Sequence, residues 1–78
     1  MIDSREYIRS LLEMGVDDYI EAADAGEVKG MLLGELRAGY SSAHYSRREY
    51  MELSDALDDM YEDGLLDPEV IADEFVLD

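Results

Sequence analysis

Apolar residues between positions 50 and 61 recur at intervals of three and four. Tyr50, Leu53 and Leu57 begin the series. This spacing puts them on one face of an α-helix, because a helix completes one turn in 3.6 residues. Similar spacing, interrupted by glycines and by Asp or Ser caps, covers most of the chain. We therefore expect one all-α domain over residues 1–78, a compact bundle of about five short helices.

The first helix has boundary signals at both ends. Asp3 and Glu6 have the spacing of a capping box. Ile2 and Tyr7 occupy the two positions of a hydrophobic staple, and Gly15 is placed to end the helix.

The next two helices are predicted from the same kinds of signal. Asp17 is expected to cap a short helix over residues 18–25, which Gly26 would stop. A third helix is expected over residues 27–38, with Gly39 as its end.

The fourth helix has the strongest signals in the chain. Ser46 and Glu49 form a Ser-x-x-Glu capping box, and Tyr45 and Tyr50 stand in staple positions. We expect this helix to run to Asp63.

The chain after the fourth helix predicts a turn and one more helix. Gly64 suits a left-handed C-cap, with Leu65 folding back on Met60. Asp67 is placed to cap a last helix whose first residue is Pro68, where the missing N–H costs nothing.

Two glycines inside the third predicted helix lie one turn apart. Gly30 and Gly34 would leave a groove on the helix surface, and each costs about 0.5–1 kcal/mol relative to alanine. We expect packing within the chain to fill that groove, by another backbone or by a bulky residue such as Met60 or Tyr61, with a homodimer contact as the second interpretation.

Charge is distributed unevenly along the chain. The formal net charge of −15 is made up of −6 in residues 1–36, +2 in residues 37–50 and −11 in residues 51–78. Direct binding of nucleic acid is disfavoured, because phosphate contacts need many Lys and Arg side chains. A basic partner is favoured.

The polar face of the fourth helix is made of carboxylates. The residues that follow this helix add further carboxylates, and no basic residue follows position 48. Most charge runs of this kind are solvated faces, which is the first alternative. The second is a partner-binding surface, and its candidate residues are Asp55, Asp58, Asp59, Glu62, Asp63, Glu69, Asp73 and Glu74.

Carboxylates four residues apart on a helix are separated by about 6 Å along the axis. Duplex DNA presents one phosphate per roughly 3.4 Å of rise on each strand, and Arg side chains bind phosphate and carboxylate with similar fork geometry. An acidic helix is therefore suited to the basic groove of a nucleic-acid-binding protein.

The stretch LSDALDDMYEDGLLDPEVIADEF resembles the acidic helix, DGL turn and second acidic helix of plasmid antirestriction proteins. More broadly, the chain resembles small acidic DNA-mimic inhibitors of phages and mobile elements, including anti-CRISPR proteins. The resemblance covers about thirty residues. It implies inhibition of a DNA-binding enzyme or effector complex in the cytoplasm, the host cytoplasm for a phage protein, with no chemistry by this chain.

Composition disfavours an enzyme or a metal protein. The chain has no Cys and one His, so it lacks the usual zinc ligand sets. A calcium loop starting at Asp59 is rejected, because Tyr61 and Val70 occupy ligand positions. We expect no catalytic residue, no metal and no cofactor.

The segment LRAGYSSAHYSRREY combines Tyr, Arg and the one His. These residue types are enriched at interface hot spots, which makes Tyr40, His44, Arg47 and Arg48 secondary contact candidates. The preferred interpretation is structural, with tyrosines stapling the fourth helix and arginines bridging to the chain's own acids.

A second function class remains open. Twenty-one acidic residues against six basic ones also fit a small helical adaptor from a halophile, without mimicry of nucleic acid. Acidity due to habitat is expected over the whole surface, whereas mimicry concentrates it. The apolar runs are too short for a membrane span, and MIDSREY lacks the features of a secretory signal.

Overall fold

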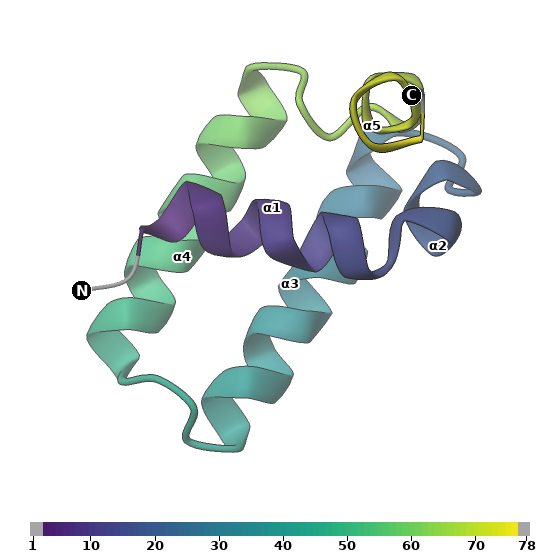
Figure 1. The fold of residues 1–78 in the computed structure, drawn as a ribbon. Coiled ribbons are helices and arrows are strands. Elements are labelled where there is room, and N and C mark those ends of the chain that lie inside the picture. Colours follow the sequence, from purple (N-terminus) through teal and green to yellow (C-terminus); the bar gives the residue numbers. More distant parts are fainter. Residues whose placement is uncertain (1–2, 77–78) are drawn as a thin grey trace.

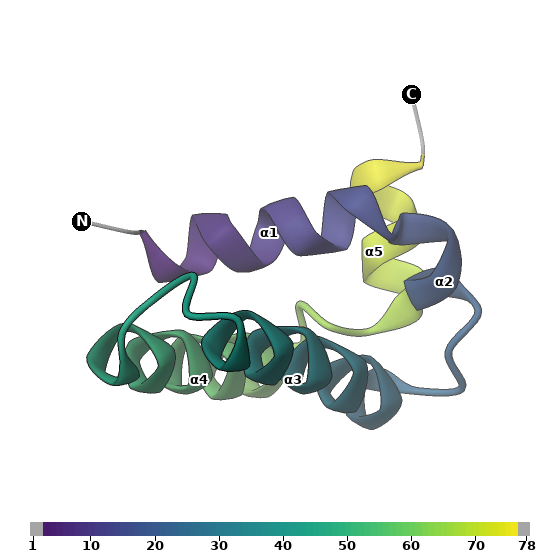
Figure 2. The same ribbon diagram turned by 90° about the horizontal axis from the view of Figure 1, so that it is seen from below.

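Two antiparallel helices, α3 and α4, lie side by side and form one layer of the molecule (Figure 1). Helix α1 crosses one face of this layer, while α2 and α5 pack together at one end (Figure 2). The computed structural model describes residues 3–76, and this part of the chain contains no strand. Its five helices are α1 (Ser4–Met14), α2 (Val16–Ile20), α3 (Ala25–Ser41), α4 (Arg47–Glu62) and α5 (Pro68–Phe75). The predicted all-α bundle is confirmed.

The core lies between α1 and the α3–α4 layer. Each helix contributes apolar residues at intervals of three or four, as the sequence pattern predicts. Leu66 and the loop residue Tyr45 close the core beyond the helix ends. The residues exposed by 3% or less are Ile8, Leu12, Val28, Leu32, Leu36, Leu53, Leu57, Met60, Leu66 and Ile71.

The region between α1 and α3 differs from the prediction. Helix α2 begins at Val16, directly after Gly15, and Asp17 lies inside it instead of capping it. The predicted span 18–25 is therefore wrong. The helix begins before the predicted position because this arrangement buries Tyr19, which is 5% exposed.

Helix α3 begins earlier and ends later than its glycines suggest. The Asp24 carboxylate accepts a hydrogen bond from the amide of Glu27, so the helix starts at Ala25 and Gly26 lies in its first turn. Gly39 also lies inside the helix instead of ending it. A Cβ at position 39 would lie 2.6 Å from the hydroxyl of Tyr45, so close approach explains this glycine.

The start of α4 agrees with the prediction. Ser46 and Glu49 exchange both capping-box hydrogen bonds, at 3.2 and 2.9 Å. The rings of Tyr45 and Tyr50 stack with centroids 6.5 Å apart.

The turn after α4 is also confirmed. Gly64 has a φ of 79°, and the Leu65 amide donates to the Met60 carbonyl at 3.0 Å. Asp67 then caps α5, with Pro68 in its first turn. At the start of α1, Asp3 accepts from the Glu6 amide at 3.2 Å, whereas the predicted Ile2 staple lies outside the described residues.

The prediction for the glycine groove is wrong. A Cβ at Gly30 or Gly34 would have no neighbour within 4 Å, so neither Met60 nor Tyr61 fills the space. Helix α3 turns Val28 and the core residues that follow it inward, which leaves these two glycines exposed.

Among residues 3–76, no helix has both the length and the apolar character needed to cross a membrane.

Candidate functional site

All eight predicted contact residues are exposed at the surface. Four lie on α4, one is its C-cap, and three lie on α5. They project from the faces opposite the buried residues of these helices, because acids and apolar residues alternate with helical periodicity. The predicted amphipathic character of α4 is therefore present in the structure.

Three of the eight carboxylates are paired with the protein's own cations. Asp58 binds Lys29 at 2.9 Å, and Asp63 binds Arg5 at 2.9 Å. Glu74 is paired with Arg9. The acidic surface is thus partly neutralised from within.

The two arginine pairs join distant parts of the chain. Arg5 and Arg9 lie one turn apart on α1, and they bind Asp63 at the end of α4 and Glu74 near the end of α5, respectively. Arg9 also lies over the ring of Phe75, 5.4 Å from its centroid. The paired side chains are about half exposed, so each pair contributes no more than about 1 kcal/mol. The first pair ties α1 to the end of α4, and the second ties α1 to α5.

Lys29 makes two contacts across the seam between α3 and α4. Its ammonium group lies 2.9 Å from Asp58 and 4.8 Å from the ring centroid of Tyr61. The hydrogen bond to Asp58 raises the pKa of Lys29 above its usual value. This contact removes Asp58 from the set of carboxylates open to a partner.

Five predicted residues have no basic partner among residues 3–76. On α4, Asp55, Asp59 and Glu62 share the outward face. By helix geometry they are spaced about 6 and 4.5 Å along the axis. On α5, Glu69 and Asp73 point away from the buried Ile71. These five form the unpaired acidic surface.

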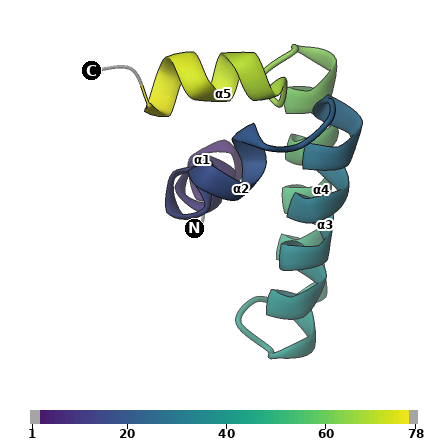
Figure 3. The same cartoon turned by 90° about the vertical axis from the view of Figure 1, so that its right-hand side faces the viewer.

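The unpaired acidic surface bends at the turn between its two helices. Figure 3 shows α5 leading away from the α3–α4 layer instead of extending the line of α4. The surface therefore consists of two rows that meet near residues 63–67.

Two carboxylates outside the predicted contact set, Asp24 and Asp67, lie beside one of its members. Asp24, Asp67 and Glu69 line a recess of about 460 Å³ between the α2–α3 loop and the start of α5. Asp24 and Asp67 are both N-caps, each accepting a backbone amide hydrogen bond. The capping role was predicted for Asp67 alone, and only the fold brings both caps to the same recess. In the described part of the chain, no group of His, Asp and Glu side chains has an arrangement that could hold a metal ion.

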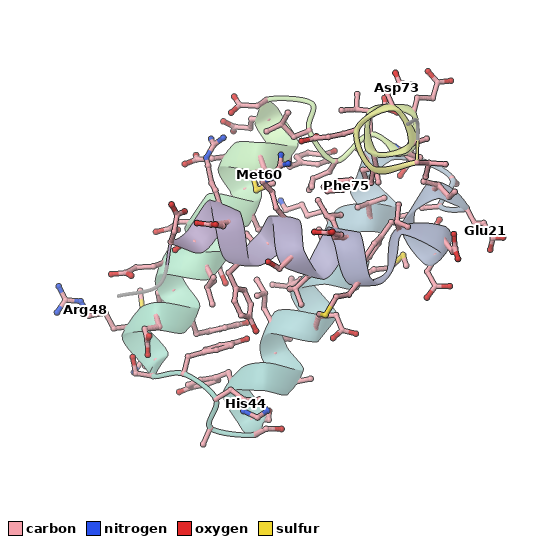
Figure 4. All side chains as sticks on the ribbon, in the orientation of Figure 1. Glu21, His44, Arg48, Met60, Asp73 and Phe75 are labelled. Atoms are coloured by element: carbon pink, nitrogen blue, oxygen red, sulfur yellow. The ribbon has the colours of Figure 1, made fainter. Side chains whose placement is uncertain are left out.

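The secondary candidates gather at the other end of α4. Figure 4 shows Arg48 and His44 far from Asp73. Arg48 lies 3.8 Å from Glu52, and Tyr40 stacks on Tyr50 with centroids 4.9 Å apart.

Arg48 lies near an acid of its own chain, as the structural interpretation predicts for the arginines, although its side chain is 90% exposed. The stacking of Tyr40 was not part of that interpretation, which named Tyr45 and Tyr50. His44 and Arg47 are exposed.

No protein-family model matches the chain, and no curated protein and no solved structure matches it either. Function is therefore argued from the geometry of the surface.

Proposed function

We propose that this protein is an inhibitor that binds the basic groove of a nucleic-acid-binding enzyme or effector complex. The observation that supports the proposal most is the row Asp55, Asp59 and Glu62, exposed on one helix face without a basic partner in the described chain. Such a row mimics the phosphates of one DNA strand in charge and, approximately, in spacing.

The physical basis of binding is charge-assisted hydrogen bonding. Arg side chains that normally clasp phosphates would clasp these carboxylates, and the partly dry groove would strengthen each pair. The charge of −15 would also steer the encounter with a cationic surface, and added salt would slow it.

The internal ion pairs refine the predicted contact set. Asp58, Asp63 and Glu74 already bind cations, so their proposed role is to position the acidic helices. The proposed contacts are the unpaired acidic surface alone: Asp55, Asp59, Glu62, Glu69 and Asp73.

The proposal is tested by a triple charge reversal with a matched control. One variant changes Asp55, Asp59 and Glu62 to Lys. The control changes Glu13, Asp17 and Glu21 to Lys; these are exposed on α1, on α2 and at the end of α2. Three reversals of two charges each take the net charge from −15 to −9 in both variants.

Each immobilised variant is incubated with cytoplasmic lysate of the source organism and eluted with duplex DNA. We expect the wild type and the control to retain the same DNA-displaceable protein, and the α4 variant to lose it. Equal retention by both variants contradicts a specific role of the α4 row. Circular dichroism verifies that all three proteins remain helical.

One observation supports the alternative, a small acidic adaptor from a salt-rich cytoplasm. Exposed carboxylates also occur on α1, α2 and α3, for example Glu13, Asp17 and Glu35. Unfolding by urea at increasing salt separates the two proposals. A halophilic adaptor would fold only near molar salt, whereas the proposed inhibitor is folded in dilute buffer.

A further inference from the structure

A groove runs between α1 and α3. None of the five residues of the unpaired acidic surface lines it. Helix α1 packs mainly against α4, which leaves the side of α3 farther from α4 partly uncovered. A recess of about 450 Å³ opens there, and a second of about 210 Å³ continues it toward the α3–α4 loop. Leu11 and Glu35 line both recesses, so the two form one groove.

Apolar and adaptable side chains line part of the larger recess. Leu11, Met14 and Met31 line it, and Met14 is 78% exposed. Methionine side chains are flexible and polarisable, and they are common on surfaces that accept partner helices. Gly34 contributes no side chain, and the space above it is empty to 4 Å, so another backbone can approach closely.

The charged groups of the groove are acidic. Asp18 and Glu35 line it, and neither has an ion-pair partner among residues 3–76. No Lys or Arg lines either recess, although His44 stands at one end. An occupant therefore has to combine an apolar strip with positive charge.

We propose that this groove binds an amphipathic helix of a partner protein, with apolar residues against the methionines and Lys or Arg beside Asp18 and Glu35. Helix-in-groove recognition uses this combination of an apolar strip and a charged rim. A second copy of the chain is disfavoured as the occupant, because each copy carries a charge of −15. The proposal is independent of the proposed inhibitor function, which uses α4 and α5.

The probe is a synthetic amphipathic helix of Leu and Lys, roughly 16 residues long so that it can form a helix. A second peptide of the same composition, with the order permuted to destroy the amphipathic face, is the control. Binding is followed by NMR of ¹³C-methyl methionine in the full chain. Met14 and Met31 report on the groove, and Met51, 56% exposed on α4, reports on binding elsewhere.

Two glycine variants distinguish binding in the groove from non-specific electrostatic attraction of the cationic peptide to the acidic protein. Gly34→Arg places a bulky cation in the groove, whereas Gly30→Arg makes the same charge change one turn away, outside the residues that line it. Both positions are open, so both variants are expected to fold.

We expect the amphipathic peptide to shift Met14 and Met31, and not Met51. Gly34→Arg should weaken its binding by at least about tenfold, whereas Gly30→Arg changes it by less than about threefold. Equal binding of both peptides, or a shift at Met51 alone, would show simple attraction to carboxylates and overturn the proposal. No binding at millimolar peptide would overturn it, as would a concentration-dependent Met14 shift without peptide, which indicates self-association.

Discussion

Different side-chain contacts flank the two ends of α4, in addition to the buried core residues that pack along its length. At its start, four tyrosines pack together: Tyr45 contacts Tyr7 edge to face at 6.0 Å and stacks near Tyr50, which also stacks on Tyr40. At its end, the exposed pair between Arg5 and Asp63 ties the helix to α1.

Packing and ion pairing respond differently to solvent. Buried aromatic contacts change little with salt, whereas exposed pairs weaken as the Debye length falls. The unpaired acidic surface extends over the electrostatic end. The contacts of the aromatic end should therefore depend less on salt than those near Asp63, where the proposed function lies.

The largest expected effect comes from removing the central ring of the aromatic end. Tyr45 is 6% exposed, and its hydroxyl donates a hydrogen bond to the Leu36 carbonyl. Tyr45→Ala should lower the free energy of unfolding by about 3–4 kcal/mol, measured by urea denaturation.

The matched control for this change is Tyr40→Ala, since Tyr40 is 40% exposed. A loss of about 1 kcal/mol is expected there, because stacking on Tyr50 accounts for most of its contribution. Equal losses of unfolding free energy in the two variants would contradict the prediction that Tyr45 contributes more to stability than Tyr40.

The next largest effect is expected from alkaline pH, which should lower the stability through Tyr45 at the aromatic end and Tyr19 on α2. Burial raises the pKa of Tyr45 and of Tyr19 above the usual 10.0. Their phenols therefore ionise more readily in the unfolded chain, so their contribution is complete below pH 10 and is lost as pH rises above it. Lys29, with its raised pKa, acts in the same direction.

Ultraviolet absorbance of phenolate measures this titration directly. We expect two of the six tyrosines to ionise late, and the Tyr45→Phe variant to lose less stability than the wild type above pH 10. Simultaneous ionisation of all six below the unfolding transition would contradict the burial of Tyr19 and Tyr45.

A smaller effect is expected at the electrostatic end. Arg9→Met removes the pair with Glu74 and the contact with the Phe75 ring, and retains an apolar stem. We expect a loss of about 1 kcal/mol at low salt, measured by thermal unfolding, that shrinks as salt is added.

The corresponding control is Arg47→Met, because Arg47 forms no ion pair among residues 3–76. Both variants make the net charge more negative by one. If their salt dependence is the same, the Arg9 contacts contribute nothing beyond charge.

The smallest effect should come from a change that touches neither end. Gly30 lies in the middle of α3, and an added methyl would meet nothing within 4 Å. Gly30→Ala should raise stability by about 0.5 kcal/mol through helix propensity, at any salt concentration. A loss of stability in urea denaturation would show that the space above Gly30 is occupied in solution.

The sequence predicts α4 and the turn after it well because their signals are local. Ser46 and Glu49 act on each other across three residues, and Gly64 acts on the turn that contains it; the structure shows each in its predicted role. Helix α2 was misplaced because burial of Tyr19, a tertiary effect, outweighs the cap signal of Asp17.

The sequence predicts which acidic residues lie on the candidate surface, but not which of them form ion pairs within the protein. The acidic face of α4 follows from periodicity alone. The partners of Asp63 and Glu74 lie 58 and 65 residues away in the sequence, so only the fold brings Arg5 and Arg9 to them. Likewise, only the packing of α3 shows that Gly34 borders an open groove.

The capping box of α4 also determines how the protein meets trypsin. Arg48 is the last site at which this protease cuts, and it lies in the first helical turn, held by Ser46 and Glu49. Cleavage there requires that turn to open and releases residues 49–78 as one uncut fragment. The rate at which this fragment accumulates therefore measures local opening at the start of α4, with no label attached to the protein.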